Sequence, residues 1–82
     1  MSRPVKRSLS LQGHATSVSL EPEFWEAFRR IARARGRAVS ALAAEIDATR
    51  PADTGLATAI RLHVLADLQR RLDAVQPAGG IE

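Results

Sequence analysis

The stretch TSVSLEPEFWEAF, residues 16–28, decides the fold, because its hydrophobic period changes from two to about four halfway along. From Thr16 to Leu20, apolar and β-branched residues alternate with serine, which predicts a half-buried strand over about residues 15–20. Glu21-Pro22-Glu23 then predicts a helix start, since proline suits the first helical position and carboxylates suit the positive end of the helix dipole. We therefore expect a strand that leads directly into a helix.

Two helices are expected between this strand and Pro51. In the first, Phe24, Phe28 and Ile31 are spaced along one apolar face, and Gly36 is placed to end the helix in a left-handed conformation. The second is expected over about residues 38–49, because Pro51 disfavours helical geometry in the residue before it, Arg50.

A third helix is expected to begin with Asp53 or Thr54 as its cap and to run to about Val75. Residues 76–82 contain Pro-Ala-Gly-Gly and are expected to form a flexible tail. The third helix has a long apolar stripe, broadened by Leu65, that comprises Leu56, Ile60, Val64, Leu68, Leu72 and Val75.

The strand over residues 15–20 must pair with a second strand, because a lone strand leaves both edges unpaired. One partner is the alternating segment Lys6–Leu11 of the same chain, joined through a turn at Gln12-Gly13-His14. The other is the same strand of a second chain, related by a two-fold axis. In the second arrangement Thr16, Val18 and Leu20 would point into a shared core, and the residues alone leave the choice open.

Composition excludes several classes of protein. With 82 residues and 8.9 kDa, the chain forms one small domain, and the absence of cysteine excludes disulfides and thiolate-bound metals. No apolar run approaches the roughly 20 residues of a membrane span, and no signal peptide is recognised. His14 and His63 are the only histidines, and no cysteine accompanies them as a metal ligand. Ser40 has no nearby histidine base in sequence, and there is no Gly-rich phosphate loop. We expect no metal, no cofactor and no enzyme, but a cytoplasmic protein that gains stability by oligomerising.

The basic residues lie mainly in the first half of the chain. Twelve Lys and Arg against nine Asp and Glu give a net charge of +3, and residues 1–20 contain three bases and no acid. This distribution favours an anionic partner. Four arginines of this half form either a phosphate-binding stripe or, as is usual for charged helices, a solvated face with Glu26 and Arg30 paired. They are Arg29, Arg30, Arg33 and Arg37.

A short strand leads through an acid-proline turn into a helix that ends at Gly36-Arg37, and a second helix opens at Ala38-Val39-Ser40. This order of elements resembles the ribbon-helix-helix family of DNA-binding proteins, which includes the Arc and methionine repressors. The resemblance covers about residues 14–49. With Ala44-Glu45-Ile46-Asp47 and the third helix, the chain is most similar to a small bacterial branch that carries an extra C-terminal helix.

The resemblance implies a mainly α fold with a short strand, built as an intertwined homodimer whose two-stranded antiparallel ribbon lies in the DNA major groove. It divides the chain into a basic arm (1–13), a ribbon-helix-helix core (14–49), a third helix (50–75) and the tail. The expected function is transcriptional regulation on double-stranded DNA at the bacterial nucleoid. The implied dimer core comprises Val18, Leu20, Phe24, Phe28, Ile31, Val39, Leu42 and Ile46.

By position, Ala15, Ser17 and Ser19 would face the bases. All three are short, whereas the family usually places long polar side chains there, so much of the affinity is expected from phosphate contacts. The implied phosphate contacts are Arg3, Lys6, Arg7, Arg37 and the N-terminus of the second helix at Ala38, Val39 and Ser40.

The third helix leaves two roles open. It either stabilises the dimer, or it contacts another protein, as antitoxins and adaptors do. The alternative function is therefore a dimeric protein-interaction module. For Trp25 we expect packing in the core or dimer interface rather than stacking on a base.

Overall fold

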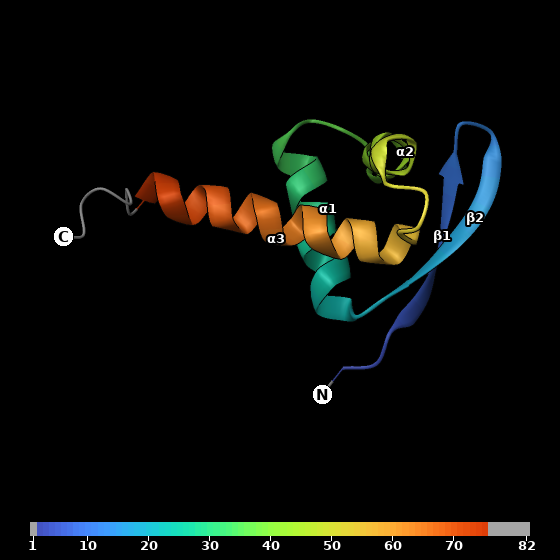
Figure 1. Cartoon of the computed structure of the whole chain (residues 1–82), viewed down its shortest axis with the longest axis horizontal. Coiled ribbons are helices and arrows are strands. Elements are labelled where there is room, and N and C mark those ends of the chain that lie inside the picture. The colour runs from blue at the N-terminus through green and yellow to red at the C-terminus, as the bar shows by residue number, and fades with distance from the viewer. Residues whose placement is uncertain (1, 76–82) are drawn as a thin grey trace.

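The computed structural model describes residues 2–75, and the predicted tail over residues 76–82 lies outside the described part. A two-stranded antiparallel sheet is followed by three helices, which is the predicted architecture. The hairpin lies at one end of the molecule, and α3 projects from the other (Figure 1). The elements are β1 (Val5–Leu11), β2 (His14–Leu20), α1 (Pro22–Ala34), α2 (Val39–Thr49) and α3 (Leu56–Val75).

The strand partner in this structure is the chain's own N-terminal segment. β1 and β2 pair from Val5 opposite Leu20 to Leu11 opposite His14. The two-residue turn explains this pairing, because Gln12 (φ 51°) and Gly13 (φ 87°) both have the positive φ that a type I′ hairpin turn requires. The ribbon is thus formed within one chain, which is one of the two arrangements that the residues left open. The family resemblance implied a ribbon formed from two chains, and the intertwined homodimer stays a prediction.

The two faces of the hairpin differ in burial as the alternation predicts. Val18 and Leu20 of β2 and Leu9 and Leu11 of β1 are buried against the helices. We call this side the inner face. The opposite side, the outer face, is exposed and comprises Lys6, Ser8, Ser10, Ala15, Ser17 and Ser19.

The end of α1 is formed as the glycine predicts. Gly36 has a φ of 64°, which a side chain at this position would make unfavourable. The Gly36 N–H donates to the Arg33 carbonyl (3.0 Å), and the Arg37 N–H donates to the Ala32 carbonyl (2.9 Å). This pair of hydrogen bonds is the Schellman motif, and it satisfies carbonyls at the end of the helix while α2 starts in a new direction.

The start of α3 differs from the prediction. The helix begins at Leu56, and its first turn is closed by the Ala59 N–H donating to the Gly55 carbonyl (3.0 Å), so neither Asp53 nor Thr54 is the cap. The physical reason is a preceding turn. The Thr54 N–H donates to the Pro51 carbonyl (3.0 Å), and Arg50 Nη1 donates to the Thr54 carbonyl (2.6 Å).

One core joins the sheet to all three helices. Phe28, Leu20, Leu42, Ile60 and Val64 are its largest fully buried side chains. Arg61 of α3 reinforces the junction between β2 and α1, because its Nε donates to Glu21 Oε1 (3.0 Å) and its Nη2 to the Ser19 carbonyl (3.3 Å). None of the helices within residues 2–75 has the length and apolar character to cross a membrane.

Candidate nucleic-acid interface

The outer face of the hairpin contains all three residues predicted to face bases. Ala15, Ser17 and Ser19 are exposed and lie opposite Ser10, Ser8 and Lys6 of β1, respectively. Because five of these six side chains are short, the face is low and polar, and Lys6 is its one long side chain. The prediction from β2 alone did not include Ser8 and Ser10. Their signal was the alternation of serine with Leu9 and Leu11, which places both serines on the same face.

The cations of the predicted basic arm are separated by the pleat of β1. Arg3 is exposed before the strand, and Lys6 is exposed on the outer face. Arg7 lies on the inner face, where its guanidinium carbon is 5.3 Å from the centroid of the Trp25 ring. Its Nε is buried and has no hydrogen-bond partner within the described residues. Arg7 therefore packs on the core side of the sheet, with its charge facing Trp25.

The N-terminus of α2 presents backbone N–H groups without a side-chain cap. Ala38 is the N-cap residue in an extended conformation, its side chain makes no capping hydrogen bond, and the first turn contains no acidic residue. Uncapped N–H groups and the positive end of the helix dipole together favour an anion. The predicted phosphate contacts at Val39 and Ser40 lie in this first turn, and both side chains are partly exposed.

A groove connects the hairpin to this helix end. Its volume is about 540 Å³, and Ser10 and Gln12 line it on the hairpin side. On the helix side it is lined by Ala38 and Ser40, among others. The outer face and the N-terminus of α2 are therefore neighbouring parts of one surface.

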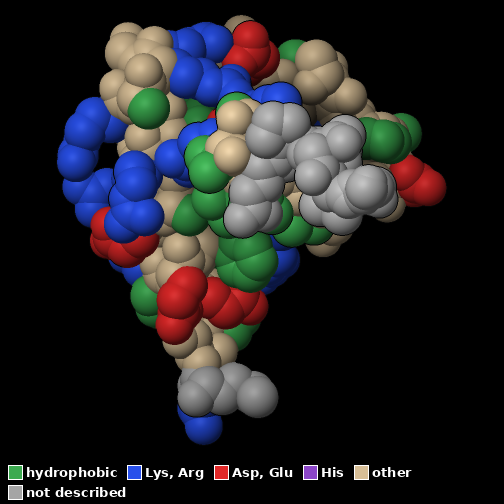
Figure 2. Space-filling model, turned by 90° about the vertical axis from the view of Figure 1, so that its left-hand side faces the viewer, with side chains coloured by type: hydrophobic (Ala, Val, Ile, Leu, Met, Phe, Trp, Pro, Cys, Tyr) green, Lys and Arg blue, Asp and Glu red, His purple; other side chains and the backbone are tan. Residues whose placement is uncertain are grey.

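Arg37 lies at this surface but is already paired with an acid. Its Nη1 donates to Glu45 Oε1 at 2.8 Å, and the side chain is 38% exposed. A second groove of about 300 Å³ has Arg29, Arg33 and Arg37 among its lining residues, on the other side of the α2 N-terminus. Figure 2 shows Lys and Arg side chains gathered on one side of the end from which α3 projects.

The arginines of α1 behave as a solvated charged face in most respects. Glu26 pairs with Arg29 (3.4 Å) three residues away, and the predicted pair between Glu26 and Arg30 was wrong. A pair at this distance between exposed side chains contributes little to stability. Arg30 and Arg33 are exposed.

The residues predicted for the dimer core all belong to the hydrophobic core of the single chain. Phe24 and Val39 are partly buried and pack against the buried cluster. Trp25 also packs against this cluster, with its ring 6.3 Å from that of Phe28. The other six, all buried, are Val18, Leu20, Phe28, Ile31, Leu42 and Ile46.

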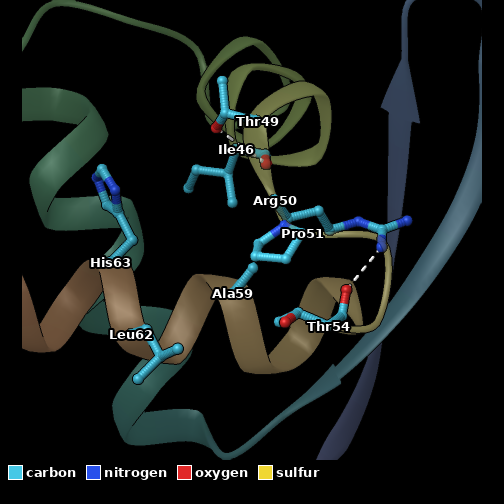
Figure 3. Close-up of a pocket in the computed structure, with 8 residues that line it drawn as sticks. All are labelled: Ile46, Thr49, Arg50, Pro51, Thr54, Ala59, Leu62 and His63. Carbon is cyan, nitrogen blue, oxygen red and sulfur yellow. Dashed lines mark hydrogen bonds between the residues drawn. The ribbon is translucent and has the colours of Figure 1, made fainter.

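His63 lies in a separate, mostly apolar groove between the end of α2 and α3 (Figure 3). The groove has a volume of about 310 Å³, and Ile46, Pro51 and Leu62 are among its lining residues. Burial lowers the pKa of His63, and the charges of Arg35 and Arg70 lower it further. Among residues 2–75, no cluster of His, Cys, Asp or Glu has the arrangement of a metal site.

The comparison with known families identifies the fold. The model of the ribbon-helix-helix domain matches residues 4–68, which include the whole hairpin, α1, α2 and most of α3. The chain belongs to the ribbon-helix-helix family. This is a family of DNA-binding regulators, and the third helix expected from the sequence corresponds to the third helix of the family model. No curated protein and no solved structure matches the chain.

Proposed function

We propose that this ribbon-helix-helix protein is a transcriptional regulator that binds double-stranded DNA as a homodimer at the nucleoid. The outer face of the hairpin lies in the major groove, which admits a two-stranded β-ribbon. The observation that carries the proposal is the exposed polar outer face, which continues through a groove to the uncapped N-terminus of α2.

Base contacts in this arrangement come from both strands. Lys6 has the length to donate to the O6 and N7 acceptors of guanine. Ser8, Ser17 and Ser19 donate or accept with any base, and Ala15 contacts only a thymine methyl group. We therefore expect modest sequence preference that depends mainly on Lys6.

Phosphate contacts supply most of the affinity. Arg3 precedes the hairpin, and the N–H groups of Val39 and Ser40 meet a phosphate at the positive end of α2. Arg37 adds a charge next to them while keeping Glu45 as its partner. Arg7 acts indirectly, because its place over Trp25 holds β1 and thereby fixes the position of Lys6.

The homodimer rests on two physical arguments. A core of this size is small for an independent domain, and association with a second copy is the usual compensation. Within the described residues, each strand of the sheet also pairs on one side only. Two copies place two outer faces on one DNA duplex, which doubles the number of phosphate contacts.

The proposal is tested by fluorescence anisotropy of labelled duplex DNA, titrated with the full chain across a salt series. We expect the logarithm of the binding constant to fall linearly with the logarithm of salt concentration. Lys6→Ala should weaken binding by roughly 5–10-fold and reduce the salt slope by about one if its contact is to phosphate, or flatten the sequence preference if it is to a base.

Arg70→Ala is the matched control. It removes one exposed positive charge from α3, and Arg70 is not part of the outer face. We expect this variant to bind as the wild type does. Absence of binding at low salt would refute the proposed function, and equal losses in both variants would show that net charge alone determines binding.

The alternative function, a dimeric protein-interaction module of the antitoxin or adaptor type, has one observation in its favour. Leu68 and Leu72 of α3 are about half exposed. The module would bind a protein partner through this helix and would lose that partner on Leu72→Glu without any change in DNA binding. A partner retained by the variant would exclude α3 as the docking surface.

A further inference from the structure

The apolar stripe of α3 is covered over its first half only. Ile60 and Val64 are fully buried against the other elements. Beyond them, α3 extends past α1 and α2 (Figure 1), and an ion pair between Asp67 and Arg35 joins it to the end of α1. The same stripe continues there as Leu65 (49% exposed), Leu68 (48%), Leu72 (56%) and Val75 (77%), which we call the bare stripe.

The spacing of the bare stripe fits a helix as its cover. The intervals of three, four and three residues are those of the a and d positions of a heptad, which form the seam between two packed helices. Two helices that meet along such a seam insert each side chain between four residues of the other. A small ligand does not fit here, because small-molecule sites are concave and this stripe is narrow and convex.

The charges beside the stripe favour a second copy as the source of that helix. Arg70 Nη2 and Arg71 Nε bond to Asp67 at 3.1 and 3.0 Å, so the basic groups already have their acid on the same helix. Residues 65–75 contain two bases, Arg70 and Arg71, and two acids, Asp67 and Asp73, which gives a net charge of zero. Two such segments do not repel each other, and a strongly acidic or basic partner would gain little from them.

The area of the stripe sets the strength of the contact. Its four side chains expose roughly 400 Å² per chain, which lies within the range of the largest apolar patch on a typical monomer. Two copies together would bury roughly 800–900 Å² before flanking atoms are counted, which is at the low end of specific interfaces. A contact of this size is weak and reversible by itself.

We propose that residues 65–75 of α3 pair with the same segment of a second copy, through a two-fold contact centred on the bare stripe. The contact is isologous, so Leu68 and Leu72 of each chain lie at its centre. It is located at the end of the molecule opposite the hairpin, and it leaves the outer face free (Figure 1). The proposal does not depend on DNA binding.

Sedimentation equilibrium of the full chain over a wide concentration range tests this contact. The variant is Leu72→Glu, and the matched control is Leu62→Glu. Both leucines are 56% exposed on α3, but Leu62 lines the groove beside His63 and lies outside the bare stripe (Figure 3). Because both side chains are exposed, both variants should fold, which circular dichroism checks.

We expect the wild type and Leu62→Glu to self-associate equally. Leu72→Glu should associate at least tenfold more weakly, or should lose one doubling of mass if the wild type forms a tetramer. The proposal is overturned if the wild type is a monomer throughout, if Leu72→Glu associates as the wild type does, or if both variants weaken association to the same extent. A monomeric wild type that nevertheless binds another protein through Leu72 would assign the stripe to that protein instead.

Discussion

The guanidinium carbon of Arg7 lies 5.3 Å from the centroid of the Trp25 ring, while its neighbour Lys6 is exposed on the opposite face of β1. Two adjacent cations thus have different roles. Arg7 forms a cation–π contact and covers the aromatic ring with its aliphatic stem. Lys6 is left as the long basic side chain of the outer face.

We predict that Arg7→Ala lowers the free energy of unfolding by about 1–2 kcal/mol, because it removes both the cation–π contact and the packing of the stem. Lys6→Ala should change it by less than about 0.5 kcal/mol, as is usual for exposed positions. Urea unfolding followed by Trp25 fluorescence measures both. If Arg7→Ala leaves stability unchanged and instead weakens DNA binding, Arg7 acts at the interface and not in the core.

The turn of the hairpin can be improved at Gln12. Its φ of 51° is unfavourable for most side chains, whereas asparagine adopts this conformation readily. Gln12→Asn should therefore stabilise the protein by on the order of 0.5 kcal/mol, and Gln12→Val should destabilise it by about 1 kcal/mol. Thermal unfolding of both variants checks the prediction. A rise in stability with valine would mean that the hairpin turn does not have this geometry in solution.

Much of the fold could be predicted from local patterns. The alternation over residues 15–20, the Pro22 helix start and the Gly36 helix end each depend on neighbouring residues, and the structure has all three. The pairing of β1 with β2 was an open choice, because a short strand pairs equally well with its own chain or with a second one. The alternation of serine with leucine at Ser8 and Ser10 therefore places these serines on the outer face only once the register of the two strands is known.

Two other features depend on specific contacts that the hydrophobic pattern and the helix-start signals do not indicate. Arg7 was grouped with the basic arm by composition, but its position is determined by Trp25, eighteen residues later. The start of α3 was missed because Arg50 and Pro51 bind the backbone of Thr54 and delay the helix. In both cases a hydrogen bond or a packing contact outweighed the local preference of the residue.

Protonation of His63 should destabilise the fold. Burial, Arg35 and Arg70 lower its pKa in the folded state, so the unfolded chain binds a proton at a higher pH, near 6.5. The contribution of neutral His63 to the free energy of unfolding is fully present above about pH 6.5 and decreases as the pH falls below that value. Urea unfolding between pH 7.5 and 5 should show a loss in the wild type that is smaller in His63→Gln. Identical pH profiles would show that His63 is freely solvated in solution.

Asp67 should be the most sensitive surface acid, because it joins α3 to the end of α1. Its side chain is 13% exposed and contacts Arg35 at 3.4 Å, as well as Arg70 and Arg71 on its own helix. Asp67→Asn should lower the free energy of unfolding by about 1 kcal/mol at low salt. The reason is that a carboxylate that accepts from several cationic donors contributes more to stability than a single surface ion pair does. The difference should shrink in 1 M salt, where screening acts over about 3 Å. Asp73→Asn is the control, because Asp73 is exposed and forms no ion pair within the described residues. Equal effects of the two substitutions, or a loss at Asp67 that salt does not reduce, would contradict the role of this cluster.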